Sequence, residues 1–265
     1  MKTRCGTALV AGLLASLATQ ADALDLAGYR LVDLGHAYGA DTLYWPSRPA
    51  AQFELERLAH GETAGGYFYS ANRFCSPEHG GTHLDAPIHF ARDRRTTDEL
   101  PLEQLFAPAI RIDVREQASK DRGYRLQPED VHRFEQKWGR IRPGTIVLLQ
   151  TGWSRYWPDR AAYFGSASAE DASGLDFPSY GEEAARLLVE DRGVALLGVD
   201  TASIDSGRSR DFLVHRLAAA ANVGGLENLT NLDQLPETGF HVIALPMKIQ
   251  GGSGGPARVV ALLSR

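Results

Sequence analysis

The stretch Glu78-His79-Gly80-Gly81-Thr82-His83-Leu84-Asp85-Ala86-Pro87-Ile88-His89-Phe90 decides how the rest of the chain has to fold. Three of the eight histidines and one aspartate fall on odd positions between residues 79 and 89. Side chains alternate between the two faces of an extended chain, so these four would share one face, and the mostly apolar opposite face would meet the core. A straight strand of this length would span roughly 33 Å, too far for one metal ion. We therefore expect bends at Gly80-Gly81 and at Pro87.

The residue types in this stretch favour a metal site. His83 and Asp85 stand two residues apart and can reach one ion without any bend. Imidazole and carboxylate donors without thiolate suit Zn, Mn or Fe rather than a cysteine-type structural zinc site. The alternative for any single pair is a hydrogen-bonded structural histidine, but three histidines and an aspartate on one face favour metal binding.

Length and composition indicate a single enzyme-sized domain. The chain has 265 residues, 43% of them hydrophobic, which is enough for one sizeable core. A net charge of −5 without a basic block argues against a nucleic-acid partner. The glycine-rich connection at residues 248–256 lacks the residue order of a phosphate-binding loop, which excludes nucleotide binding there.

The first residues resemble an export signal. Lys2 and Arg4 precede an apolar run at residues 8–18, and Ala21-Asp22-Ala23 matches a small-x-small cleavage site. We expect a signal peptide at 1–23, a mature domain at 24–265, a periplasmic or secreted location and no membrane association after processing. An uncleaved anchor is the alternative. Processing would leave Cys75 as the only cysteine, and we expect a small buried residue there rather than a catalytic thiol.

Aromatic residues near the histidine stretch are candidates for substrate contacts. Trp45 ends a loop, and the β-prone segment 66–74 leads directly into the metal stretch. We expect Trp45, Phe68 and Phe74 to line a pocket for a planar ligand. For each of them, packing in the core is the alternative.

The remaining pattern predicts a mixed α/β fold, with α+β character, in a single domain. Continuous apolar runs at 145–150 and 194–199 predict central strands buried on both faces, and the segment 180–191 between them predicts a helix, giving a βαβ unit. Further strands are expected at 29–34, 53–58, 109–114, 240–245 and 257–263, and further helices at 100–106, 126–138 and 211–221. Residues 153–174 are expected to form an irregular surface excursion, at a pocket rim or a dimer contact.

The residues from His79 to His89 also fit the pattern H-x-G-T-H-x-D-x-P-x-H at every fixed position. This resembles the signature of the cyclase superfamily of metal-dependent hydrolases, which includes bacterial kynurenine formamidases and isatin hydrolases. The resemblance continues to the end of the chain, through Gly198-Val199-Asp200-Thr201, Ser203-Ile204-Asp205, His215, Leu226-Glu227-Asn228-Leu229 and Pro246-Met247-Lys248-Ile249.

The resemblance implies a swivelling β/β/α fold and a role for each site residue. His79, His83 and Asp85 would bind a first divalent metal, and His215 and Glu227 would complete a second site. His89 would be the catalytic acid/base rather than a ligand, and Trp45 would contact the substrate. The family implies one or two ions of Zn or Mn per chain and a homo-oligomer, either a dimer or a tetramer.

The resemblance also implies hydrolysis of a C–N bond in a small aromatic amide, formamide or lactam. An acid at Glu227 favours a two-metal, formamidase-like site, whereas the export signal and the segment 153–174 depart from kynurenine formamidases. A kynurenine formamidase proper, a lactone hydrolase and an exported binding protein without turnover are the alternatives. The presence of His89 argues against the binding protein.

Overall fold

A computed structural model describes residues 26–265, so the expected signal peptide at 1–23 lies outside the described residues. The centre of the fold is an eight-stranded mixed sheet with the order β1-β12-β11-β5-β7-β9-β10-β4. Strand β4 also pairs with β12, which closes seven of the strands into a barrel and leaves β1 as an outer addition. The mixed α/β, single-domain prediction is confirmed.

The strands of this sheet are β1 (Tyr29–Asp33), β4 (His83–Asp85), β5 (Phe106–Asp113), β7 (Ile146–Gln150), β9 (Leu196–Val199), β10 (Gly224–Glu227), β11 (Phe240–Pro246) and β12 (Gly254–Ser264). Two smaller pairs are β2 (Glu54–Glu62) with β3 (Phe68–Cys75), and β6 (Arg125–Leu126) with β8 (Ser179–Tyr180). The α-helices are α1 (Leu102–Leu105), α2 (Arg115–Lys120), α3 (Pro128–Trp138), α4 (Arg160–Phe164), α5 (Glu182–Arg186) and α6 (Leu213–Ala220).

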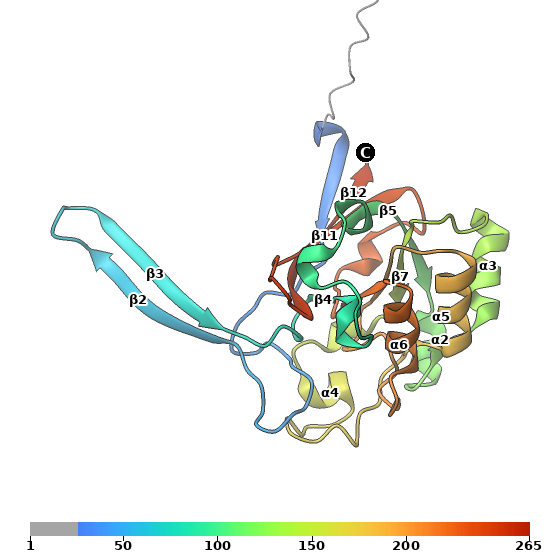
Figure 1. The fold of residues 1–265 in the computed structure, drawn as a ribbon, viewed down its shortest axis with the longest axis horizontal. Helices are drawn as coiled ribbons and strands as arrows, with labels where there is room; N and C mark the ends of the chain where they lie inside the picture. The colour runs from blue at the N-terminus through green and yellow to red at the C-terminus, as the bar shows by residue number, and fades with distance from the viewer. Residues whose placement is uncertain (1–25) are drawn as a thin grey trace, which may run out of the picture.

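The parallel part of the sheet is covered by helices. Strands β5, β7, β9 and β10 run parallel, and every residue of β7 and β9 is buried. Helices α3, α5 and α6 lie along one side of these strands (Figure 1). The continuous apolar runs at 145–150 and 194–199 are therefore central strands, as predicted, because both of their faces are covered.

The antiparallel part has one face in the barrel and one face outside. Val242 and Ala244 of β11 and Val259 and Ala261 of β12 point inward and are completely buried. Their neighbours alternate outward, and several of these are exposed. This period of two is the pattern expected of strands with a single covered face.

Two expected segments differ from the structure. The predicted helix at 180–191 begins as α5 but continues from Leu187 to Asp191 as a π-helical turn. The segment 153–174 is an organised satellite core rather than a loose excursion, because Trp153, Tyr163 and Phe164 are buried against Leu43. Its aromatic residues supply the apolar area that holds it to the barrel.

The segment 54–75 differs most from the expected pair of short strands. It forms a long antiparallel ribbon, β2–β3, that extends away from the body (Figure 1). Cys75 at its base is exposed, so the prediction of a buried cysteine was wrong. No helix among the described residues is both long and apolar enough to cross a bilayer.

Candidate metal centre and active site

The histidine stretch bends at its two glycines. Gly80 has φ 150° and Gly81 has φ 58°, conformations that L side chains rarely adopt. A Cβ at Gly80 would lie 2.1 Å from the ring of Tyr44, and one at Gly81 would lie 2.6 Å from the ring of Tyr38. The predicted bend is therefore present, and both the backbone angle and the close packing demand glycine. Only His83–Asp85 is a strand, since residues 87–89 form a 3₁₀ turn that begins at Pro87.

His83 is fixed in orientation. Its Nδ1 donates to the carbonyl oxygen of Gly81 at 3.0 Å, so Nε2 is the nitrogen that faces the carboxylates. Nε2 lies 3.1 Å from Asp85 Oδ1 and 3.5 Å from Glu227 Oε2. Glu227 reaches this point because β10 pairs with β4 and places Glu227 opposite His83.

His215 reaches the same centre from the start of helix α6. Asp205 accepts the His215 Nδ1–H at 2.7 Å, which leaves Nε2 free. That Nε2 lies 3.1 Å from Asp85 Oδ2 and 3.1 Å from Glu227 Oε1. The two segments predicted to complete the site, more than a hundred residues after the first one, do fold back onto it.

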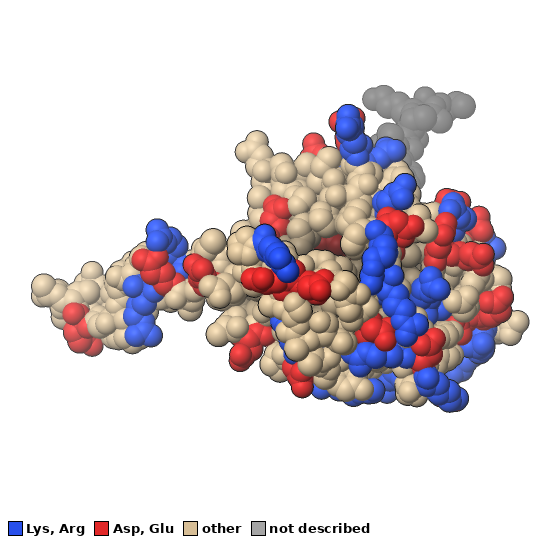
Figure 2. Space-filling view, turned by 90° about the horizontal axis from the view of Figure 1, so that it is seen from below, with Lys and Arg blue, Asp and Glu red and all other residues tan. Residues whose placement is uncertain are grey.

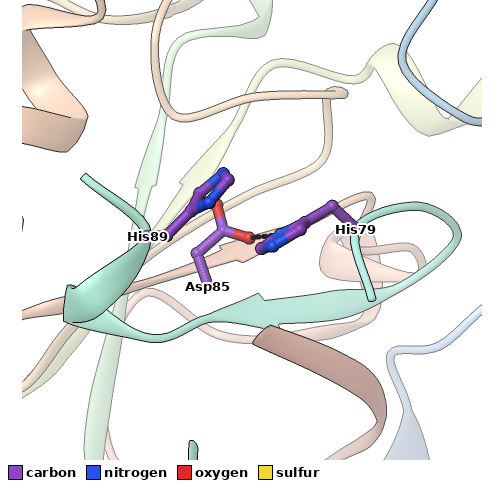
Figure 3. A group of neighbouring side chains, drawn as sticks. All are labelled: His79, Asp85 and His89. Atoms are coloured by element: carbon purple, nitrogen blue, oxygen red, sulfur yellow. Dashed lines mark hydrogen bonds and ion pairs between the residues drawn. The ribbon is translucent and has the colours of Figure 1, made fainter. Parts of the chain in front are cut away.

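Asp85 lies at the centre of the cluster, beside two further histidines. Figure 3 shows its carboxylate next to the rings of His79 and His89, and His79 Nδ1 lies 2.6 Å from Asp85 Oδ1. The other nitrogen of His79 lies 2.8 Å from the hydroxyl of Ser253, which in turn contacts Glu78. The His79 and His89 rings stack with centroids 3.8 Å apart.

The histidines and carboxylates of this cluster shift one another's pKa values. Burial alone would lower the pKa of His83, but the carboxylates of Asp85 and Glu227 outweigh it and raise that pKa to about 9. His215 behaves in the same way: burial opposes its charge, yet Asp205, Asp85 and Glu227 hold its pKa well above the usual value. Burial would raise the pKa of Asp85, but the surrounding histidines hold it well below its ordinary value. The carboxylate of Asp85 is therefore ionised, and as a buried charge it needs positive charge beside it.

These residues fit a divalent metal ion. Among the described residues, two sets of donor atoms each lie within 4.8 Å of one another: His79, Asp85 and His89, and His83, Asp85 and Glu227. Asp85 belongs to both sets and could be shared by two ions. The sets differ from the expected ones, because His79 and His83 fall in different sets and His215 falls in neither. Nitrogen and carboxylate oxygen without sulfur match Zn or Mn. An ion would also supply the positive charge that the buried Asp85 and Glu227 require.

His89 differs electrostatically from the other histidines. The His89 side chain is exposed at the pocket, but partial desolvation by the surrounding protein, together with the nearby histidines, lowers its pKa to about 4 even though Asp85 acts in the opposite direction. The ring is therefore neutral at pH 7 and able to accept a proton. His89 also lies close to His79 and Asp85. Its position is therefore compatible with two roles, as a general base or as a metal ligand.

A pocket with aromatic walls opens onto the cluster. It has a volume of about 260 Å³ and is lined by all six polar residues predicted for the site. Trp45 lines it as well, with its ring 5.9 Å from that of Phe212 and 6.3 Å from that of Phe177. Leu43, Phe90, Phe164 and Phe212 supply further apolar wall, and Gly80, Ala202, Ser203 and Asn228 complete the lining.

The prediction that Phe68 and Phe74 line the pocket of their own chain was wrong. Both belong to the β2–β3 ribbon, are 56% and 50% exposed, and take no part in lining this pocket. Both residues lie on a ribbon that projects away from the body, so their side chains do not reach the metal cluster. Their place is taken by Phe90, which alternation assigned to the core, and by Phe212.

Several other residues of the site had no role assigned from the sequence. Asp205 orients His215, Ser253 contacts His79, and Asn228 donates to the carbonyl oxygen of Gly81 at 2.7 Å. Phe212 precedes helix α6 with a left-handed φ of 52°, a conformation that costs free energy and recurs at functional sites. Asp205 and Asn228 lie within the matched motifs, but Ser253 and Phe212 carry no local pattern that could have singled them out.

Comparison with known proteins agrees with this geometry. The family model named Cyclase matches residues 32–206. The chain is 31% identical to the isatin hydrolase of Roseibium aggregatum over 80% of this chain and 81% of that protein. It is 28% identical to the kynurenine formamidase of Salinibacter ruber over 87% and 96% of the two chains.

A solved structure shares the whole architecture. Isatin hydrolase A from Ralstonia solanacearum superposes with a TM-score of 0.82 at 35% identity, covering 97% of this chain and 100% of the other. The family match spans the strand and both bends that carry His79, His83 and Asp85. The chain belongs to the Cyclase family.

Proposed function

We propose that this protein is a metal-dependent hydrolase that cleaves a C–N bond of a small aromatic amide, formamide or lactam. The observation that carries the proposal is the buried cluster of histidines and carboxylates at the base of a pocket with aromatic walls. The relatives named as isatin hydrolase and kynurenine formamidase support both the reaction and the aromatic substrate.

The metal would be held by His79, His83 and Asp85, with His215 and Glu227 completing a second position. A bound Zn or Mn ion supplies Lewis-acid chemistry, since it acidifies water and polarises a carbonyl oxygen. The hydrogen bonds to Gly81 and Asp205 point the free nitrogens of His83 and His215 at the centre. Such orienting bonds fix the tautomer and raise the basicity of the ligands.

His89 would move the proton. It is neutral at pH 7, faces the pocket and stacks on His79, so its position is fixed relative to the metal ligands. In this role His89 takes a proton from the attacking water and returns it to the leaving nitrogen. Because the same group gives back the proton it received, the reaction needs no second acid.

The aromatic walls would orient the substrate. Trp45, Phe90 and Phe212 offer ring faces and edges to a planar molecule, and the pocket volume of about 260 Å³ suits a small one. Few charged groups other than those of the metal cluster reach the pocket. A neutral aromatic ring next to the bond to be cleaved fits this arrangement better than a charged sugar or phosphate does.

A substrate screen tests the proposed reaction. Protein loaded separately with Zn and with Mn is incubated with N-formyl aromatic amines, isatin-like lactams and aromatic lactones, and products are followed by mass spectrometry. We expect turnover of at least one C–N substrate, lost on chelation and restored by metal. Tight binding of a panel member without turnover at any metal loading would instead make the protein a binding module, and turnover of lactones alone would move the reaction to C–O bonds.

We also propose that the chain is exported and forms a homo-oligomer. The basic and apolar segments before residue 24 support export. Cell fractionation together with the mass of the mature N-terminus tests this proposal. A mature chain that begins at residue 1, or a protein found only in the cytoplasm, would contradict it.

A further inference from the structure

His79 has a hydrogen-bonding partner on each of its two ring nitrogens. Nδ1 lies 2.6 Å from Asp85 Oδ1, inside the donor cluster, and Nε2 lies 2.8 Å from Ser253 Oγ. Ser253 stands directly before β12, and its hydroxyl also contacts the carboxylate of Glu78. A line of contacts therefore leads from the buried Asp85 through His79 and Ser253 to the partly exposed Glu78.

The direction of each hydrogen bond in this line follows from the groups involved. Glu78 Oε2 accepts the backbone N–H of Ser253 at 3.2 Å, and it accepts the hydroxyl proton of the same serine. A serine hydroxyl has a single proton, so its oxygen accepts on the other side, from the Nε2–H of His79. A histidine that binds metal is neutral, so the ring keeps its one proton on Nε2 and turns the lone pair of Nδ1 toward the cluster.

The other two histidines expected to bind metal show the reverse arrangement. The Nδ1–H of His83 goes to the carbonyl oxygen of Gly81. The Nδ1–H of His215 goes to the carboxylate of Asp205. Both rings turn Nε2 toward the buried carboxylates at the centre. Each of the three rings thus has one nitrogen held by a fixed acceptor, but His79 is the one that faces the cluster with Nδ1.

The backbone around Ser253 is held firmly in place. The N–H of Ala86 donates to the carbonyl oxygen of Ser253 at 2.8 Å. The buried Thr97 donates to the carbonyl oxygen of Gly252 from its N–H at 2.9 Å and from its hydroxyl at 3.0 Å. These bonds fix the peptide units on both sides of the serine, so its hydroxyl is presented at a defined position.

Glycines before and after Ser253 make its approach to both partners possible. A Cβ at Gly254 would lie 2.5 Å from Cε1 of His79, and one at Gly252 would lie 2.8 Å from Oε1 of Glu78. Contacts this short do not occur with real Cβ atoms, so any larger residue would push the histidine or the glutamate away. The segment is therefore built so that one small polar side chain stands between Glu78 and His79.

We propose that Glu78 and Ser253 are positioning residues that fix the tautomer of His79, so that His79 binds the metal through Nδ1. The inference rests on the proposed function and adds two residues to its metal site. A carboxylate that receives the second N–H of a ligating histidine, here through a hydroxyl, orients the ring and raises its basicity. Neither residue takes part in lining the pocket, so their loss should act on metal binding rather than on substrate contacts.

A purely mechanical role is the alternative for this pair. The β2–β3 ribbon stands clear of the body in two perpendicular views (Figures 1 and 2), and Glu78 follows its last residue, Cys75, at the point where the chain returns to the body. A contact between Glu78 and Ser253 would by itself fasten the base of the ribbon. Such a fastening needs no histidine, whereas the same hydroxyl also bonds the His79 ring. The two roles differ in which ring nitrogen they leave for the metal.

NMR of the protein loaded with a spin-active cadmium isotope identifies the ligating nitrogens. A histidine bound through Nε2 couples the metal to both carbon-bound ring protons, whereas one bound through Nδ1 couples it to Hε1 alone. We expect His79 to show the Hε1 coupling only, and His83 to show both. Coupling of the metal to both ring protons of His79 in the wild type would overturn the proposal without any variant.

Substitution of the pair measures its effect on the affinity for zinc, by competition with a chromophoric chelator. Ser253→Ala removes the acceptor of the Nε2–H and should lower the affinity about 10–100-fold. Ser253→Thr keeps the hydroxyl and should bind zinc almost as tightly as the wild type. Glu78→Gln keeps an acceptor oxygen without the charge and should lie between the wild type and Ser253→Ala. Ser119→Ala, on the exposed side of helix α2, is the matched control and should change nothing.

A mechanical fastening would give a different set of results. Ser253→Ala would then lower the Tm of the metal-free protein while its zinc affinity and the coupling pattern of His79 stayed as in the wild type, and that result would overturn the positioning role. Near-ultraviolet circular dichroism of the variant checks that it is folded. A wild type that binds no metal would contradict the proposed function together with this inference. Zinc binding that is equal in Ser253→Ala and wild type would overturn the inference alone.

Discussion

At the scale of single residues, Asp85 connects both sets of donor atoms, and its loss should remove metal and activity together. Asp85→Ala should reduce metal content to about a tenth of wild type or less, and kcat/KM by at least about 100-fold. Metal analysis by mass spectrometry and steady-state kinetics check this prediction. Asp171→Ala, which removes an exposed carboxylate outside the pocket lining, is the control and should change neither quantity. A single ion per chain in the intact protein would exclude the bridging role.

Substitution of His89 tests its proposed role in proton transfer. His89→Ala should retain metal and lose about 10²–10⁴-fold in kcat, because acid–base assistance is worth that much. His132→Ala, a surface histidine on helix α3, is the matched control. A His89→Ala protein that lost its metal would instead make His89 a ligand, in agreement with its closeness to His79 and Asp85.

The raised pKa of His83 makes metal binding depend on pH. Below about pH 9 the His83 ring is protonated in the metal-free protein, and a metal must displace that proton before it can bind. Affinity should therefore rise between pH 6 and pH 9, by up to about tenfold per pH unit for each proton released. Titration calorimetry in two buffers of different ionisation enthalpy measures the released protons. An affinity that stayed flat over this range would show that His83 does not bind the metal.

At the scale of elements, the junction between β9 and α6 positions a ligand. Asp205 accepts hydrogen bonds from the backbone N–H groups of Val214 and His215 and from the His215 ring, so one carboxylate both starts the helix and aims the imidazole. Asp205→Asn should lower metal affinity about 10–100-fold. Asp211→Asn, on the exposed segment before the helix, should have no effect. Equal affinities for the two variants would show that Asp205 serves only the helix.

The elements also show how much could be predicted from the sequence. The buried strands β7 and β9 and the bend at Gly80-Gly81 follow from local patterns, because apolar runs and paired glycines act within a few residues. The walls of the pocket could not be predicted in the same way. Phe212 reaches the pocket through a left-handed turn, and the pairing of β12 with β4 brings Ser253 beside His79. The prediction for Phe68 and Phe74 failed because an aromatic, β-prone sequence is equally typical of a strand that lines a pocket and of a strand in a projecting arm.

At the scale of the whole molecule, the buried acids make stability depend on the metal. Chelation leaves Asp85 and Glu227 buried without their cation, and an ion present at 1,000 times its Kd adds about 4 kcal/mol of stability. We expect a decrease in Tm of roughly 10 °C on chelation, fully reversed by added Zn or Mn. Differential scanning calorimetry measures it. Identical Tm values with and without metal would show that the cluster is balanced by its own protons.

The pairing of β12 with both β1 and β4 also constrains the order in which parts of the chain can fold. Strand β12 is the last described strand, and it closes the barrel beside the histidine stretch while holding β1 on its other side. A nascent chain that still lacks residues 254–264 can form helices and the parallel strands, but it cannot bring Ser253 beside His79 or shut the barrel. Such long-range pairing is slow to form, because loop closure has to precede it. Residues 254–264 therefore have to be made before the barrel can close beside the histidine stretch, although all the expected metal ligands, from His79 to Glu227, precede them in the chain.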